Sequence, residues 1–203
     1  LEGSGGNYER AYDLLNESFA VMRQVEAAWP TALSIMSLGQ VALARGDLTG
    51  ARDRFDEAMI AAKQEGKRRI TVIVQSGLAD VERRSGHYAE AKAMYRDTLM
   101  WWNEFQNRGA VARCMECLAF VAASEGDANG ESLQAAATLL GAAEKIRETS
   151  SDMTTRERDE YASELAVLRK RLNPDALEAG WSRGRAMEYE AATAFALGDG
   201  AQI

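Results

Sequence analysis

The stretch LGQVALARGDLTGARDRFDEA, residues 38–58, places two amphipathic segments on either side of a Gly46-Asp47 turn. Apolar residues recur three and four positions apart in both segments, which is the periodicity of helices that bury one face. The glycine lies where the first helix must end, because glycine adopts a left-handed backbone without a steric penalty from Cβ. The stretch therefore predicts two helices joined by a short turn.

The same pattern returns every 40 residues along the first two thirds of the chain. Several independent columns that agree on one period predict a repeat architecture. The columns are Gly6, Gly46, Gly86 and Gly126; Ala11, Ala51 and Ala91; Leu15, Phe55 and Tyr95; and Leu38, Leu78 and Leu118. Small residues follow the last column at Gly39, Ala79 and Ala119, where a bulky side chain is expected to overpack the helix pair at a cost of about 1–3 kcal/mol.

These columns resemble the tetratricopeptide repeat. The residues that carry the resemblance are Leu38, Gly39, Gly46, Ala51, Phe55 and Ala58. The period exceeds the usual 34 residues of that family, and we expect the extra length at the end of the second helix of each pair. Glu82 departs from the pattern, because its equivalents one repeat away are Ala42 and Ala122.

The expected fold is all-α: a right-handed superhelix of antiparallel helix pairs over residues 1–150, closed by capping helices over residues 151–203. When the 40-residue columns are aligned, residues 8–28 correspond to the second helix of a unit whose first helix would lie upstream. We therefore expect a longer array, and we expect another copy of the chain to cover the exposed apolar face of this helix in a homodimer. That face consists of Leu14, Leu15, Phe19, Met22 and Val25.

The C-terminal segment contains further helix signals and a second resemblance. Thr154-x-x-Glu157 has the form of a capping box, Asn173-Pro174 marks a helix start, and EYEAATAFAL ends at Gly198. The motifs Leu140-Gly141-Ala142-Ala143-Glu144 and Trp181-x-x-Gly184-x-x-Met187 resemble the C-terminal end of large bacterial signal-transduction ATPase regulators of the LuxR type and related classes. The resemblance implies a cytoplasmic regulatory arm, with ATP bound only in an upstream domain and DNA bound elsewhere.

The tetratricopeptide resemblance also implies a concave groove lined by the first helix of each pair. Apolar anchors beside charged and amide side chains suit a protein, a peptide or a small inducer. The inward positions carried over to this chain are Met36, Gln40, Leu43, Ile73, Ser76, Asp80, Arg83, Arg113, Glu116 and Phe120. They could equally be ordinary groove residues without a cognate ligand.

Composition and motifs argue against several other classes. A net charge of −7 argues against a basic nucleic-acid surface, and no apolar run is long enough for a membrane span. The single histidine, His87, falls in a turn, and neither a catalytic triad nor a phosphate loop is present. We therefore expect no catalytic residue, no metal and no cofactor in these residues.

Two residue pairs have a functional and a structural interpretation. Cys114 and Cys117 are expected to be reduced core residues, since two ligands do not make a zinc site. Trp101 and Trp102 could clamp a ligand if both were exposed, but apolar equivalents one repeat earlier favour packing for at least one of them.

The leading hypothesis is a non-catalytic interaction and sensor domain. One alternative is an assembly scaffold without an inducer. The other is an enzyme on helical hairpins, which would need a deep pocket of titratable groups with perturbed pKa values.

Overall fold

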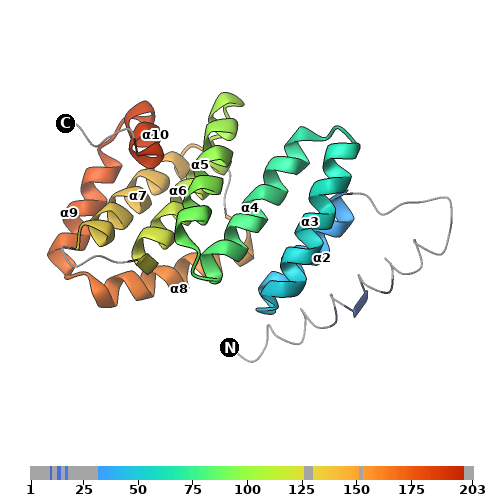
Figure 1. Cartoon of the computed structure of the whole chain (residues 1–203). Coiled ribbons are helices and arrows are strands. Elements are labelled where there is room, and N and C mark those ends of the chain that lie inside the picture. The colour runs from blue at the N-terminus through green and yellow to red at the C-terminus, as the bar shows by residue number, and fades with distance from the viewer. Residues whose placement is uncertain are drawn as a thin grey trace. The chain divides into compact units, whose positions relative to one another are not determined.

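The computed structural model describes residues 32–125, 130–150 and 153–198, together with residues 10, 13, 14 and 17. In these ranges the regular secondary structure is α-helical (Figure 1). The prediction of an all-α helical repeat is confirmed. The helices are α2 (Ala32–Ala44), α3 (Leu48–Gln64), α4 (Arg68–Arg84), α5 (Tyr88–Glu104), α6 (Arg108–Glu125), α7 (Glu131–Arg147), α8 (Thr155–Arg171), α9 (Pro174–Arg185) and α10 (Tyr189–Leu197).

The chain forms two compact units, residues 1–94 and residues 95–203, and the boundary between them falls within α5. In the first unit α2, α3 and α4 pack against one another. In the second unit α7 packs between α6 and α9, while α8 and α10 each contact α6 and α7. The predicted division at residue 150 into repeats and cap stays a prediction.

One type of turn ends successive helices at intervals of 20 residues. The backbone has positive φ at Gly46 (81°), Gly66 (67°), Gly86 (84°) and Gln106 (55°). In each turn two backbone N–H groups reach back to carbonyls of the preceding helix, as in Asp47 N to Ala42 O at 3.0 Å and Gly46 N to Leu43 O at 3.1 Å. This is the Schellman arrangement, which satisfies carbonyls that the helix end leaves open.

The spacing of the turns corrects the expected helix lengths. Because α4 and α5, the two helices of one pair, both contain 17 residues, the extra length of the 40-residue repeat is shared by both helices and is not confined to the second. The turns also link consecutive helices tightly, since the residue after each turn residue can cap the next helix. Asp47 Oδ1 accepts from Gly50 N at 2.9 Å, and Asn107 Oδ1 accepts from Ala110 N at 3.1 Å.

Phe55 is at the centre of the first unit. Its side chain is fully buried, and its ring lies against glycines from two different helices. A Cβ added at Gly39 of α2 would lie 2.8 Å from the ring, and a Cβ added at Gly77 of α4 would lie 2.6 Å from it. The ring therefore fills the space that the two missing side chains leave. Gly39 was expected from the repeat columns, whereas Gly77 was not.

The C-terminal helix signals are confirmed. Thr154 and Glu157 form a reciprocal capping box at the start of α8. Asn173 Oδ1 accepts from Ala176 N at 2.8 Å at the start of α9, with Pro174 as the first helical residue. Gly198, with φ of 88°, ends α10.

The contact between Phe55 and Gly77 can be tested by a double-mutant cycle. An exposed helical Gly→Ala change stabilises by about 0.5–1 kcal/mol, but Gly77→Ala should destabilise by about 1–3 kcal/mol because the ring must move. In a Phe55→Leu background the shorter side chain leaves room, so the penalty of Gly77→Ala should fall or change sign. Urea unfolding followed by far-UV circular dichroism measures all four variants. An equal penalty in both backgrounds would contradict the contact.

Candidate functional site

The two halves of the C-terminal signature meet where α7 crosses α9. A Cβ added at Gly141 would lie 2.1 Å from the carbonyl oxygen of Trp181, and one at Gly184 would lie 2.0 Å from that of Thr138. A Cβ at Gly180 would lie 2.8 Å from Ala137 Cβ. Glycine at these positions therefore lets the two helix backbones touch, and any side chain would force them apart.

Polar side chains of the signature also link α7 and α9, at the solvent-exposed edge of their contact. Trp181 Nε1 donates to Glu144 Oε2 at 2.7 Å, and Arg185 Nη1 donates to the same oxygen at 2.6 Å. Arg185 Nη2 also lies 2.5 Å from Glu148 Oε1. Hydrogen bonds from Lys145 and Arg185 hold the pKa of Glu148 below its usual value. The signature thus describes how α7 and α9 pack, and these exposed ion pairs add little to stability.

The predicted groove residues of the first unit divide into core and surface positions. Met36 and Leu43 belong to the hydrophobic core, and Asp80 and Arg83 are also buried. The prediction that Met36 and Leu43 line an open groove is wrong, because α2 contacts both α3 and α4 and its side chains are covered from two sides. The half-buried members of the set are Gln40, Ile73 and Ser76.

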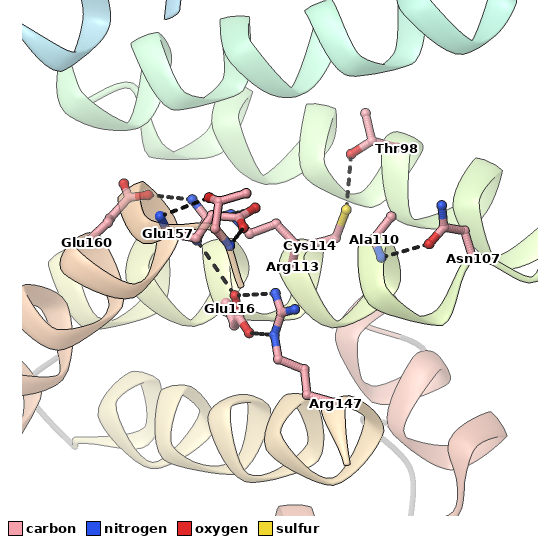
Figure 2. Close-up of polar contacts among 10 residues, drawn as sticks. Thr98, Asn107, Ala110, Arg113, Cys114, Glu116, Arg147, Glu157 and Glu160 are labelled. Atoms are coloured by element: carbon pink, nitrogen blue, oxygen red, sulfur yellow. Dashed lines mark hydrogen bonds and ion pairs between the residues drawn. The ribbon is translucent and has the colours of Figure 1, made fainter. Parts of the chain in front are cut away.

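The predicted groove residues of the second unit lie together on α6 and are covered. Glu116 is fully buried, and Phe120 is 1% exposed. Arg147 of α7 holds Glu116 with two nitrogens, Nε at 2.5 Å and Nη2 at 3.1 Å. Arg113 Nη1 lies 3.6 Å from Glu116 Oε2, and its guanidinium carbon lies 5.8 Å from the centre of the Phe120 ring. The cluster is shown in Figure 2.

The cover over these α6 residues is α8. Glu160 forms an ion pair with Arg113, and Glu157 Oε1 lies 3.8 Å from Arg113 Nε (Figure 2). The Tyr161 ring meets the Phe120 ring edge to face, with centroids 6.3 Å apart. The expectation that Arg113, Glu116 and Phe120 line an open groove is therefore wrong in this structure, because a helix assigned only to the cap occupies their face.

The electrostatics of the cluster keep Glu157 charged and Tyr161 neutral. Burial raises the pKa of Glu157, but hydrogen bonds with Thr154 and the nearby Arg113 guanidinium lower it by more, so the net pKa lies below the usual value. Burial and the Glu116 carboxylate raise the pKa of Tyr161 well above its usual value. Neither Glu157 nor Tyr161 therefore exchanges a proton near neutral pH.

The histidine and the off-pattern glutamate of the first unit form a contact that the sequence reasoning missed. Glu82 is 7% exposed and lies between two basic groups: His87 Nδ1 at 2.8 Å and Arg52 Nη2 at 2.7 Å. Burial raises the pKa of Glu82, whereas its bonds to His87 and Arg52 lower it by more. The sequence did contain a signal for this contact: Glu82, which departs from the repeat pattern, lies five residues before His87, the single histidine of the sequence. His87 is thus a turn residue that pairs with α4.

The cysteine and tryptophan pairs are in packed positions. Cys114 and Cys117 are buried and are not joined in a disulfide, and the Thr98 hydroxyl lies 3.6 Å from Cys114 Sγ. Trp102 is 7% exposed, which confirms packing for at least one tryptophan. Trp101 is half-buried, stacks on Phe105 with centroids 4.1 Å apart, and meets Trp102 edge to face. The two indoles therefore do not form a parallel clamp.

The predicted self-association face falls almost wholly outside the described residues. Leu14 is described and is 57% exposed. Leu15, Phe19, Met22 and Val25 lie outside the described residues. Self-association through this face stays a prediction.

Gly184→Ala tests whether the signature is a packing motif. At an exposed helical site the change would stabilise by about 0.5–1 kcal/mol, so a loss of about 1–3 kcal/mol is diagnostic of overpacking against the Thr138 carbonyl. Ser182→Ala on the exposed side of α9 is the matched control and should stay within about 0.5 kcal/mol of the parent. Urea unfolding followed by tryptophan fluorescence measures both. A stabilised Gly184→Ala chain would refute the packing role.

Comparison with known proteins supports the repeat assignment. Residues 30–99 match the model of the tetratricopeptide repeat family. Comparisons with curated proteins and with solved structures give no significant match.

In the described part of the chain, no helix combines the length and apolarity needed to cross a membrane, and no group of three or more His, Cys, Asp or Glu residues is placed to hold a metal ion. Residues 30–99 thus form tetratricopeptide-like repeats, which suggest a protein-interaction function.

Proposed function

We propose that this chain is a non-catalytic protein-interaction and sensor domain of a bacterial multidomain transcriptional regulator that works in the cytoplasm. The observation that carries the interaction role is the tetratricopeptide match over residues 30–99. The regulator role is supported by the resemblance of Leu140–Glu144 and Trp181–Met187 to the C-terminal end of such regulators. Nucleotide and DNA would then be bound by other domains, and neither a membrane nor nucleic acid by these residues.

The half-buried residues of the first unit are the proposed contact positions for a peptide or a small inducer. Gln40 on α2 and Ser76 on α4 offer polar groups, and Ile73 packs at the edge of the core. Leu33 on α2 is 52% exposed and adds an apolar contact. A ligand bound here can switch the protein only if it binds one conformational state more tightly than the other.

The complete gene tests the regulator assignment. A nucleotide-binding loop and a DNA-binding helix-turn-helix in the same reading frame are expected. A reading frame that encodes neither would contradict the assignment.

Thermal shift separates a sensor from an assembly scaffold. A metabolite that binds only the native state, supplied at a free concentration of 100 times its Kd, should raise the free energy of unfolding by about 2.7 kcal/mol. The shift should shrink in a Gln40→Ala/Ser76→Ala chain and persist in Thr49→Ala, a matched polar-to-alanine change at an exposed position of α3. A dose-independent melting temperature across a metabolite panel, combined with self-association in sedimentation, would favour the scaffold and contradict the sensor.

A further inference from the structure

Helix α8 buries far less of its side-chain surface than α7 does. Its sequence, TRERDEYASELAVLRKR, is highly charged, and Leu168 is its one buried side chain among the described residues. Val167 beside it is 44% exposed. By contrast, α7 buries side chains along most of its length. The attachment of α8 therefore rests mainly on polar and aromatic contacts at its surface.

These contacts converge on one face of α6, which we call the α6 face and define as Arg113, Glu116 and Phe120. Glu157 and Glu160 of α8 meet Arg113, and Tyr161 meets Phe120. Figure 2 shows the two glutamates on α8 reaching the Arg113 side chain, with the Glu116–Arg147 pair beneath them. Farther along, Arg171 donates to the Ala123 carbonyl. The α6 face thus binds a helix that presents Glu-x-x-Glu-Tyr.

The main helix crossing of the second unit, between α7 and α9, does not involve α8. The crossing of α7 and α9 is fixed by Gly141 and Gly184 against backbone atoms, without α8. The capping box of α8 comes from its own Thr154 and Glu157, so this cap takes no group from another helix. Ion pairs at a partly exposed surface contribute specificity more than affinity. A second helix with the same groups would replace each of these contacts.

We propose that the α6 face is a docking surface for an acidic helix of a partner protein, carrying two glutamates and an aromatic residue in the order Glu-x-x-Glu-Tyr, and that α8 occupies this surface until the partner displaces it. This inference rests on the proposed interaction function and names the class of partner. A basic helix would meet Arg113 and Arg147 and would be repelled, so charge selects the acidic partner.

The tether gives α8 a high effective concentration at the α6 face, so a partner helix must bind this face more tightly than α8 does, and a peptide copy of α8 competes poorly with it in the intact chain. The test therefore weakens α8 in the full chain and supplies the same helix from outside. The probe is a fluorescein-labelled peptide of residues 154–172, and the readout is fluorescence anisotropy. Glu160→Lys places a positive charge against Arg113 and should release α8. Asp159→Lys makes the same charge change at the adjacent, exposed position and serves as the matched control.

The Glu160→Lys chain should bind the peptide roughly ten-fold or more tightly than the parent chain, because a larger fraction of its molecules presents an open α6 face. The Asp159→Lys chain should bind like the parent. Adding Arg113→Ala to the Glu160→Lys chain should weaken peptide binding strongly, because the peptide glutamates lose their cationic partner while the lysine at position 160 gains no opposite charge there. A peptide with Glu157 and Glu160 both changed to Lys should not bind.

Circular dichroism on each variant shows whether it keeps its helix content. If the Glu160→Lys chain loses helix content, the Tyr161→Ala chain is used in its place, since that change removes the contact with Phe120 without charge repulsion. Equal peptide binding by the Glu160→Lys, Asp159→Lys and Arg113→Ala/Glu160→Lys chains would place binding elsewhere and overturn the proposal. Absence of peptide binding in every variant with native helix content would overturn it as well. So would a released α8 that docks on the α6 face of a second copy of the chain, in a domain-swapped dimer that binds no peptide. Neither result affects the Gln40→Ala/Ser76→Ala test, which addresses the first unit alone.

Discussion

Close approach of helices at glycine is the constraint on which both units depend. In the first unit the Phe55 ring fills the space left by Gly39 and Gly77, so three helices share one buried side chain. In the second unit Gly141 and Gly184 bring the α7 and α9 backbones into contact without any side chain between them. Dispersion contacts at such short range are many and collectively strong, and they leave no room for a methyl group.

The repeat pattern made the turns and much of the core predictable. Gly46 and Gly86 have the left-handed conformation that their column required, and Phe55 is buried where its column placed it. Thr154 and Asn173 cap the helices that their local signals predicted. These features were accessible because each depends on residues close together in the chain or on positions one period apart.

The features that sequence reasoning missed depend on tertiary contacts with no periodic signal. Gly77 contacts Phe55 although no glycine recurs one period before or after it. Arg113 and Glu160 are 47 residues apart, and nothing in either helix alone indicates that they pair. The groove prediction failed at Glu116 and Phe120 for the same reason: a family pattern places first helices at a concave face, but it does not say which other segment covers that face.

The second unit thus combines two kinds of attachment, short-range packing between α7 and α9 and charge-dominated docking of α8 on α6. Native-state hydrogen exchange of the intact chain, resolved by helix, tests this distinction most directly, because it reports the free energy of each local opening. We expect the amides of α8 to exchange by local opening ahead of those in α6, α7 and α9. Exchange of α8 together with α7 and α9 as one cooperative unit would contradict it.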